Sequence, residues 1–562
     1  DDRQPIDEII ADPIARLAQL RVKPHPRIPL PHDLYGPERK NARGLDLVDP
    51  TTLTDLREGL VAALRRPWSA APIIAGIEQT GAAEPVFDPN DRRRQIGEVV
   101  PADPADVDQA LARAVRSAPM WDRTPAGERA ALLEAAADLY EGRMTELMAL
   151  IVREGGRTIP DALSEVREAV DYLRYYAVRA RADFAGPAPL PGPAGERNEI
   201  ELRGRGVFAC ISPWNFPLAI FTGQIAAALA AGNAVVAKPA EQTPLIAAAA
   251  VRLMLEAGIP GEVLHLLPGT GEAVGAPLAA DPRIAGIAFT GSTETARHIN
   301  LELARRPGPI VPFIAETGGQ NAMIVDSSAL AEQVAADILA SAFDSAGQRC
   351  SAARLLYVQA DIADRLLAML AGAMAELAIG DPALIATDVG PVIDATAKEA
   401  LEHHAARMER EGRLIYRCAL PSGTEHGTYF APQAFEIDSA ARLTGEVFGP
   451  ILHVVHWHTD RLDAVLDEIA ATGYGLTLGI HSRIDETVRH ILARLRVGNS
   501  YVNRSMIGAV VGVQPFGGES LSGTGPKAGG PRYLHRFATE RTVSTDTTAA
   551  GGNATLLSLQ EN

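Results

Sequence analysis

The feature that most constrains the fold is a pattern that repeats four times between residues 206 and 315. Each repeat begins with a short apolar run typical of a buried strand and continues into a turn that starts a helix. The four strand-like runs are residues 207–211, 234–237, 263–267 and 284–289. Strands that alternate with helices of about 10–15 residues form βαβ units and a mostly parallel sheet. We therefore expect an α/β fold whose ligands bind beyond the carboxyl ends of the strands.

A cysteine in a run of small residues is the strongest candidate for chemistry. Cys350 lies in the stretch Ser345-Ala346-Gly347-Gln348-Arg349-Cys350-Ser351-Ala352. Small neighbours give access, and the positive charge of Arg349 is expected to lower the thiol pKa from its usual value of about 8.5. The alternative is a buried and inert cysteine, because free cysteines are often small core residues. The stretch alone leaves both interpretations open.

Two glycine-rich turns, at residues 268–271 and 290–293, follow strand-like runs and open helices. The backbone N–H groups and the positive end of the helix dipole at such turns suit a pyrophosphate. Residues 269–275, however, have the spacing GxGxxxG, which is one residue longer than the usual dinucleotide fingerprint. The pattern leaves nucleotide binding and simple helix capping both open.

Composition narrows the range of partners. The formal net charge is -17, whereas a nucleic-acid surface needs a concentrated basic face, so we expect no nucleic-acid partner. The three widely spaced cysteines, Cys210, Cys350 and Cys418, fit neither a disulfide framework nor a metal site, which favours a reducing, cytoplasmic compartment. No run of about 18 apolar residues predicts a membrane span. The chain opens without an initiator Met or a signal peptide, as expected of a piece of a longer polypeptide.

Further elements are predicted from start signals and apolar periodicity. Helices are expected from Asp103-Pro104, from Thr124-Pro125 and over residues 7–22, 51–64, 159–179, 333–346 and 362–377. Strand-like runs at residues 355–358 and 451–455 continue the α/β pattern. The stretch 24–44 is rich in Pro, Gly and charge, so it is interpreted as a linker or arm.

Residues 184–203 predict a projecting hairpin. The Pro- and Gly-rich run 186–193 cannot form a helix interior, and residues 197–202 alternate between apolar and polar. Exposed strand edges of this kind often pair with another chain. The low-charge tail 536–562 would also need a partner surface to become ordered. We expect both segments to serve oligomerisation, most simply of a homodimer.

Six short stretches together resemble the NAD(P)-dependent aldehyde dehydrogenase superfamily. They are Ile211-Ser212-Pro213-Trp214-Asn215-Phe216-Pro217, Lys238-Pro239-Ala240-Glu241-Gln242-Thr243-Pro244, Phe289-Thr290-Gly291-Ser292, Glu316-Thr317-Gly318-Gly319-Gln320-Asn321, Gly347-Gln348-Arg349-Cys350 and Glu446-Val447-Phe448-Gly449-Pro450. They occur in the family's order, within a match from about residue 86 to 540. The resemblance implies a Rossmann-like NAD-binding domain and an α/β catalytic domain. It divides the chain into an N-terminal arm or inter-module linker at 1–85, the NAD-binding domain at 86–183 and 204–317, the oligomerisation flap and tail at 184–203 and 536–562, and the catalytic domain at 318–535.

Chemistry in this family passes through a cysteine thioester, and the resemblance assigns three residues to it. Cys350 would attack the aldehyde carbonyl as a thiolate. The Asn215 side-chain amide and the Cys350 backbone N–H would stabilise the resulting oxyanion. Glu316 would activate the water that hydrolyses the thioester.

The resemblance also assigns the cofactor site. Lys238 and Glu241 would hold the adenosine ribose hydroxyls, and an acid there repels a 2′-phosphate, so NAD is expected rather than NADP. Ser292 would hold the pyrophosphate, and Trp214 would lie along it. The set is completed by Glu446 and Phe448 at the nicotinamide ribose and by Ile211, Ser212, Pro213, Gly271, Thr290, Gly291 and Gly318.

The late loop 506–518 resembles the glutamate-semialdehyde (pyrroline-5-carboxylate) dehydrogenase branch. In that branch a serine after the nucleophile and two backbone amides of the loop anchor the substrate carboxylate. The matching positions are Ser351, Gly508 and Ala509. The expected site is completed by Phe216 and Phe516, around the aliphatic chain, and by Arg349. The resemblance implies NAD-dependent oxidation of L-glutamate γ-semialdehyde to L-glutamate, the second step of proline catabolism.

The arm carries a further resemblance. Residues 30–36 and 41–46 resemble the segment that joins the two modules of bifunctional proline-utilisation (PutA) proteins, and residues 547–553 resemble the end of the shorter type. An FAD-dependent proline dehydrogenase module would then precede this chain.

Two other functions stay open. Another small or carboxylated aldehyde is one possible substrate, and CoA rather than water is one possible acyl acceptor, although Glu316 argues against CoA. The alternative from a different functional class is a binding or structural protein that keeps a dehydrogenase scaffold without its activity. The presence of Cys350, Glu316 and Asn215 argues against it.

Overall fold

The chain forms two compact units, Asp1–Arg43 and Gly44–Asn562. The structure, a computed structural model, describes residues 5–20, 25, 27–193 and 195–547. Within these residues, none of the helices is both long enough and apolar enough to cross a membrane.

The first unit holds two short helices in place of the single helix predicted over residues 7–22. They are α1 (Ile6–Ile9) and α2 (Pro13–Gln19), and the 3-10 turn η1 (Pro31–Asp33) follows them. Proline has no backbone N–H and clashes with a preceding helical turn, so it begins a helix more readily than it continues one. Asp12 caps the new helix by accepting a hydrogen bond from a backbone N–H of its first turn.

In the second unit, the repeated pattern of residues 206–315 forms most of a seven-stranded sheet in the order β12-β11-β8-β9-β10-β2-β3. Its strands are β2 (Ile73–Ile74), β3 (Ile77–Glu78), β8 (Val207–Ile211), β9 (Ala234–Lys238), β10 (Leu264–Leu266), β11 (Ile284–Thr290) and β12 (Phe313–Glu316). The helices between them are α8 (Ala219–Ala230), α9 (Pro244–Glu256), α10 (Ala276–Ala280) and α11 (Thr293–Arg305). The five strands from β8 to β12 pair in parallel, which confirms the predicted α/β fold.

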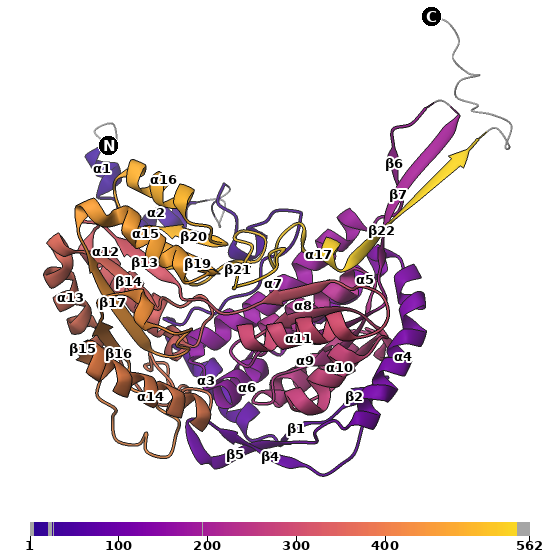
Figure 1. Ribbon diagram of the computed structural model, residues 1–562, viewed down its shortest axis with the longest axis horizontal. Helices are drawn as coiled ribbons and strands as arrows, with labels where there is room; N and C mark the ends of the chain where they lie inside the picture. Colours follow the sequence, from indigo (N-terminus) through magenta and orange to yellow (C-terminus); the bar gives the residue numbers. More distant parts are fainter. Residues whose placement is uncertain (1–4, 21–24, 26, 194, 548–562) are drawn as a thin grey trace, which may run out of the picture. The chain divides into compact units, whose positions relative to one another are not determined.

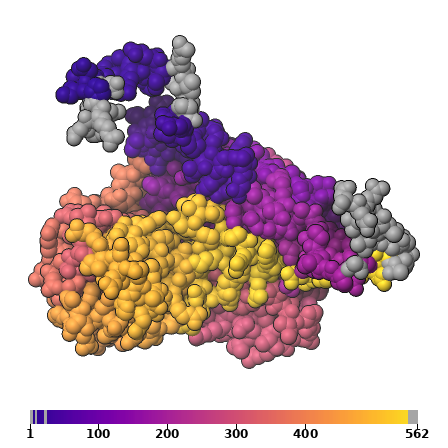
Figure 2. Space-filling model, turned by 90° about the horizontal axis from the view of Figure 1, so that it is seen from above, coloured from indigo at the N-terminus to yellow at the C-terminus, as the bar shows by residue number. Residues whose placement is uncertain are grey.

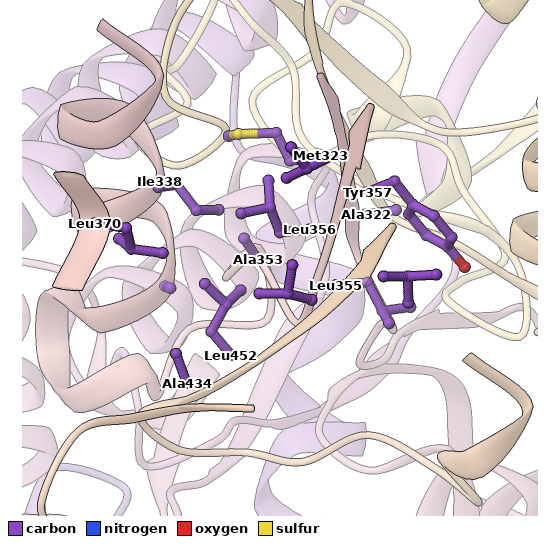
Figure 3. Close-up of a cluster of buried hydrophobic side chains, with 14 of the residues drawn as sticks. Ala322, Met323, Ile338, Ala353, Leu355, Leu356, Tyr357, Leu370, Ala434 and Leu452 are labelled. Atoms are coloured by element: carbon purple, nitrogen blue, oxygen red, sulfur yellow. The ribbon is translucent and has the colours of Figure 1, made fainter. Parts of the chain in front are cut away.

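A second seven-stranded sheet has the order β15-β16-β17-β14-β13-β19-β20. Its strands are β13 (Ala322–Val325), β14 (Leu355–Gln359), β15 (Arg413–Arg417), β16 (Gln433–Glu436), β17 (Ile451–Trp457), β19 (Thr477–His481) and β20 (Asn499–Val502). The helices are α12 (Ala331–Phe343), α13 (Ala360–Ala375), α14 (Ala395–Glu411), α15 (Leu462–Ala471) and α16 (Asp485–Arg494). The strands are parallel except at β15 and are apolar along most of their length, because helices cover both faces. Figure 3 shows Leu356 and Leu452 of this sheet packed with Ile338 and Leu370 of the covering helices.

A further group of helices packs on the first sheet and on the helices that cover it. It consists of α3 (Pro50–Leu64), α4 (Pro104–Arg123), α5 (Ala126–Gly142), α6 (Met144–Gly155) and α7 (Ile159–Asp183). Two buried carboxylates attach this group to the helices of the sheet. Glu154 of α6 accepts hydrogen bonds from two backbone amides at the start of α9 (2.7 and 2.9 Å). Glu165 of α7 accepts two at the start of α8 (2.8 and 3.3 Å). These bonds satisfy N–H groups that a helix leaves unpaired at its N-terminus, and they hold α7 in place beside α8.

Three smaller sheets complete the unit. They comprise β1 (Trp68–Ala70) with β4 (Glu84–Asp88) and β5 (Asp91–Val99), β18 (Tyr474–Gly475) with β21 (Glu519–Ser520), and β6 (Ala188–Leu190) with β7 (Glu196–Gly204) and β22 (Ala538–Asp546). The predicted hairpin of residues 184–203 is present as antiparallel β6 and β7, and β22 pairs along the other edge of β7. These strands extend away from the rest of the unit (Figure 1). Of the predicted tail 536–562, residues 538–546 form β22 and pair with β7 of the same chain, and residues 548–562 lie outside the described residues.

The segment that precedes β22 spans the two large sheets. Figure 2 shows it in yellow on one face of the molecule. Its strand β21 pairs with β18, the Gly529 amide donates to the Tyr176 hydroxyl of α7 (2.9 Å), and the short helix α17 (Tyr533–Arg536) follows. Residues 519–536 thereby contact both β18 and α7.

Candidate active site

Cys350 lies in a sharply bent segment between α12 and β14. Three consecutive residues just before it, Ser345, Ala346 and Gly347, have φ angles of 57°, 53° and 64°. The left-handed region is unfavourable for residues other than glycine, so such a run persists only where the surroundings hold it. A side chain at Gly347 would clash with the Gly449 carbonyl, which explains the glycine at the third position. The bend brings Cys350 to the surface of a pocket.

The backbone around Cys350 is held by side chains on its carbonyl oxygens. Every carbonyl from residue 347 to residue 352 accepts a hydrogen bond from a side chain, and the donors are Arg354 for residues 347 and 349, Asn215 for 348, Asn321 for 350 and 352, and Thr477 for 351. The Cys350 backbone N–H makes no hydrogen bond within the described part of the chain. It therefore stays available to donate a hydrogen bond to the oxyanion that forms when the sulfur attacks a carbonyl carbon.

A pocket of about 110 Å³ opens at Cys350. It brings together many of the positions singled out in the sequence: Phe216, Thr290, Glu316, Arg349, Cys350, Ser351, Gly508, Ala509 and Phe516. Asn215 is buried beside the pocket, and its amide donates to the Gln348 carbonyl (3.1 Å). This hydrogen bond uses one N–H of the Asn215 amide and leaves its second N–H as a donor for a ligand. Phe216 and Phe516, which are 300 positions apart in the chain, thus line one cavity.

Glu316 is the last residue of β12 and faces this pocket. Its Oε2 accepts the Gly518 amide (2.9 Å), and its buried Oε1 has no hydrogen-bond partner among the described residues. Burial raises the pKa of Glu316 to about 8, against the opposing effects of the Gly518 hydrogen bond and of Lys527. A carboxyl with a pKa near the working pH and a free oxygen is suited to general-base catalysis.

The thiol of Cys350 is hard to ionise in this setting. Burial raises its pKa to about 12, with further contributions from Glu446, Glu316 and Glu168, and Arg354 acts in the opposite direction. The expectation that Arg349 lowers the thiol pKa needs correction. The Arg349 guanidinium pairs with Asp161 of α7 (2.5 Å) and donates to the Ser345 hydroxyl (2.9 Å), so its charge is directed away from the sulfur.

A second group of predicted residues gathers around Arg354, which lies 3.7 Å from the Glu446 carboxylate and 5.2 Å from the centre of the Phe448 ring. Trp214 and Phe448 pack edge to face with ring centroids 5.4 Å apart. A side chain at Gly318 would clash with the Glu446 carboxylate, so glycine is required there for the acid to approach. Burial raises the pKa of Glu446 to about 6, while Arg354 opposes this effect.

The carboxyl ends of the parallel strands supply the remaining positions. Ile211 pairs with Lys238, and Thr290 pairs with Glu316, so these residues share one edge of the sheet. Lys238 is buried, and burial lowers its pKa while the nearby Glu241 raises it. Glu241 itself is exposed.

The start of α11 also lies at this edge. Ser292 caps the helix by accepting the Thr295 amide (3.1 Å), and Gly291 precedes it in a position where a side chain would clash with the Phe289 ring. Pro213 and Ser212 follow β8, and the Ser212 hydroxyl is buried without a hydrogen-bond partner among the described residues.

The unusual GxGxxxG spacing has a structural explanation. Residues Gly271–Gly275 form one turn of π-helix, η3, in which the Ala276 amide bonds to the Gly271 carbonyl. A π turn closes over five residues rather than four, so it takes up the extra residue before α10 begins. Gly271 remains open, because a side chain added there would meet no atom within 4 Å.

Comparison with protein-family models matches residues 77–543 to "Aldehyde dehydrogenase family". The chain belongs to the aldehyde dehydrogenase family.

Individual relatives agree with this assignment. "Bifunctional protein PutA" of Klebsiella aerogenes is 52% identical over 555 residues, covering 96% of this chain and 41% of the relative. "1-pyrroline-5-carboxylate dehydrogenase" of Geobacillus kaustophilus is 36% identical over 503 residues, covering 87% of this chain and 96% of the relative. A solved structure of a Bradyrhizobium japonicum proline utilization A (PutA) mutant is 53% identical with a TM-score of 0.87, covering 98% of this chain and 52% of that one. The chain thus spans less than half the length of the curated bifunctional relative.

Aldehyde dehydrogenases generally use NAD or NADP, and the residues of this chain fit such a cofactor. The Ser212 hydroxyl and the Glu446 Oε1 are buried without hydrogen-bond partners among the described residues, so each can accept one from a ligand. The open space at Gly271 and the capped start of α11 offer backbone N–H groups to a diphosphate.

Several residues of this aldehyde dehydrogenase site were not singled out in the sequence. Ser164, Glu168 and Tyr172 of α7 line the pocket at four-residue spacing, and burial raises the pKa of Glu168 to about 7. A polar stripe on an otherwise buried helix is the signal that could have identified them. The sequence around Arg354 and Asn321 gives no such signal, because their hydrogen bonds to residues 347–352 form only when segments distant in the chain come together.

Proposed function

We propose that this chain oxidises L-glutamate γ-semialdehyde to L-glutamate with NAD, through a thioester at Cys350. The observation that carries the proposal is one pocket that holds Cys350, Glu316 and the pair Gly508 and Ala509. A named 1-pyrroline-5-carboxylate dehydrogenase that is matched over nearly its whole length supports the choice of substrate.

The end of the pocket at Gly508 suits a carboxylate. Gly508 has a φ of 80°, and the amides of Gly508 and Ala509 make no hydrogen bond within the described part of the chain. Together with the neighbouring Ser351 they provide three donors for a carboxylate. An aldehyde without an acid group would leave these donors unpaired, which disfavours a simple aliphatic substrate. Glu168 lines the same pocket and complements the α-ammonium group of the substrate.

The side chains can perform the two half-reactions in order. The Cys350 thiol gives up its proton to water and its sulfur bonds to the aldehyde carbon. The Cys350 N–H and the second N–H of the Asn215 amide receive the oxyanion that forms as the carbonyl double bond opens. The dinucleotide, when bound, supplies the hydride acceptor for the oxidation. The free Oε1 of Glu316 then takes a proton from water, which attacks the thioester and releases glutamate and the thiol. Phe216 and Phe516 enclose the aliphatic chain.

The residues around the sheet edge hold the dinucleotide in this proposal. Lys238 and Glu241 bind the adenosine ribose, Ser292 with its helix start binds the diphosphate, and Glu446 positions the nicotinamide ribose. Trp214 and Phe448 provide the apolar walls between these points, and the remaining contacts come from Ile211, Ser212, Pro213, Gly271, Thr290, Gly291 and Gly318.

We expect NAD to be preferred over NADP, and Glu241 to account for a measurable part of that preference. The Glu241→Gln variant should raise kcat/KM for NADP about fivefold, because one like charge near a phosphate costs about 1 kcal/mol in water-exposed surroundings. Glu302→Gln on α11, which removes an exposed partner of Arg305, is the matched control. Initial rates with each cofactor measure the effect, and an unchanged NADP value in Glu241→Gln would argue against this placement of the ribose.

The substrate assignment is tested with Ser351. We expect wild-type enzyme to prefer glutamate semialdehyde over butanal, and Ser351→Ala to raise KM for the semialdehyde about tenfold while leaving butanal unaffected. The reason is that a hydrogen bond to a charged group contributes about 1.5 kcal/mol. The measurement is kcat and KM for both aldehydes. Equal losses with both aldehydes would show that Ser351 supports the loop rather than the carboxylate.

The wider organisation is part of the same proposal. We assign residues 86–183 and 204–317 to the NAD-binding domain around the first large sheet, to which β2 and β3 add two edge strands from residues 73–78, and residues 318–535 to the catalytic domain around the second. Strands β6, β7 and β22 serve a homodimer contact. The three free cysteines support a reducing, cytoplasmic setting. The similarity to bifunctional PutA proteins supports an FAD-dependent proline dehydrogenase module that precedes residues 1–85.

A further inference from the structure

Arg354 connects the two halves of the site. Its side chain is completely buried, and it donates to the carbonyls of Gly347 (2.6 Å) and Arg349 (2.9 Å), on the near side of Cys350. The same guanidinium lies 3.7 Å from the Glu446 carboxylate and packs over the Phe448 ring at 5.2 Å. One rigid group thus contacts both the nucleophile segment and the Glu446 carboxylate.

The position of Arg354 depends on a histidine in the neighbouring strand. The Arg354 carbonyl accepts two hydrogen bonds from His453 of β17, one from its backbone N–H (3.0 Å) and one from its ring Nδ1 (3.0 Å). His453 is completely buried in a strand whose neighbouring residues are apolar. A buried imidazole is costly unless both ring nitrogens have partners, so the second nitrogen must be satisfied too.

His404 of α14 satisfies it. The two Nε2 atoms lie 2.8 Å apart, and the Nδ1 of His404 lies 3.4 Å from the Arg407 guanidinium. A carbonyl can only accept and a guanidinium can only donate, so both ends of this chain fix the direction of its hydrogens. His453 therefore carries its proton on Nδ1, and His404 carries its proton on Nε2. Both rings must be neutral for this arrangement, and burial holds their pKa values at about 3 and 4.

We propose that His453, oriented by His404, is a positioning residue for Cys350. It fixes the backbone of Arg354, so that the guanidinium holds residues 347–350 and the Glu446 carboxylate in their relative positions. The proposal rests on the proposed function in that Cys350 is the reacting group. Because Arg354 is the cation that favours the Cys350 thiolate against Glu446, Glu316 and Glu168, a displaced Arg354 leaves the sulfur harder to ionise.

A purely structural role for the histidine pair would affect stability alone, so the test measures the sulfur directly. The experiment is alkylation of the full chain by iodoacetamide between pH 6 and 10, with Cys350 followed by peptide mass. It needs neither cofactor nor substrate, so failure of the proposed reaction and failure of this inference are distinguishable. Cys210 and Cys418 are buried and serve as internal references.

We expect His453→Leu to move the alkylation profile of Cys350 to higher pH, with the rate at pH 8 falling on the order of tenfold for each unit of pKa. His453→Gln should restore the wild-type profile, because its amide can donate to the Arg354 carbonyl and accept from His404. His456→Leu is the matched control, since His456 lies on the same strand and near Glu436 rather than Arg354. If His453→Leu fails to fold, the same alkylation profile is measured on His404→Leu. This variant changes the less buried of the two histidines and removes the hydrogen-bond donor to the His453 ring. A folded His453→Leu or His404→Leu protein with an unchanged profile would overturn the proposal.

Discussion

The Cys350→Ala variant is expected to lose NADH formation from glutamate semialdehyde by a factor of about 10⁴ or more, which is the scale seen when an enzyme loses its nucleophile. No other thiol can replace it. Cys210 is buried within β8, and Cys418 is buried with its thiol donating a hydrogen bond to the Met374 carbonyl. The pocket that opens at Cys350 contains no second cysteine among its described lining residues.

The measurement is the absorbance of NADH in the steady state and in a single turnover. Cys418→Ala is the control, because it also removes a thiol but lies outside the pocket and should keep wild-type activity. Binding of NADH, followed by its fluorescence, should be unchanged in Cys350→Ala and shows that the fold is intact. A Cys350→Ala enzyme that keeps a tenth of its rate would mean that the thioester route is wrong.

The parallel sheet and much of the site could be predicted because both depend on local patterns. An apolar run followed by a turn and an amphipathic helix specifies a βαβ unit, and parallel units place their carboxyl ends together. Ile211, Thr290 and Glu316 each end a strand of the same sheet, so their meeting follows from the topology. The family resemblance then supplied the prediction of which of these residues carry chemistry.

The electrostatics around the Cys350 thiol could not be predicted in this way. The expectation that Arg349 lowers the thiol pKa used its position next to Cys350 in the sequence. Its actual partner is Asp161, which lies 188 residues away on α7, and adjacency in the chain says nothing about such a contact. The helpful charge comes from Arg354 instead. Two residues that are adjacent in the sequence need not have side chains that face each other. The pKa of a thiol depends on which charges lie near it in the folded structure.

The same reason explains why the sequence did not predict which side chains support the bent segment. Asn215, Asn321 and Thr477 lie in three separate parts of the chain, and each donates to one or two carbonyls of residues 348–352. Nothing in their local sequence marks them as donors to one loop. Asn215 was singled out through the family resemblance as an oxyanion donor, and the structure adds that its amide also holds the Gln348 carbonyl.

The Glu316→Gln variant is expected to stop after the first turnover. Glutamine has nearly the same shape and its oxygen can still accept the Gly518 amide, so the pocket should stay intact. It cannot take a proton from water, so hydrolysis of the thioester should slow by about 10²- to 10⁴-fold, the usual contribution of a general base. A rapid-mixing experiment should show a burst of one NADH per Cys350, followed by a slow steady state. Glu519→Gln, which removes a nearby exposed carboxylate paired with Arg496, should behave as wild type.

The pH dependence supplies an independent check of Glu316. Burial raises its pKa to about 8, so its basic form decreases about tenfold for each pH unit below that value. Where hydrolysis limits turnover, kcat of the wild-type enzyme should therefore rise with pH and level off above about pH 8, and the residual rate of Glu316→Gln should lack this rise. Lys527 opposes the raised pKa, so Lys527→Met should move the midpoint to higher pH. A wild-type profile that is flat from pH 6 to 9, or a Glu316→Gln enzyme without a burst, would place Glu316 outside the hydrolysis of the thioester.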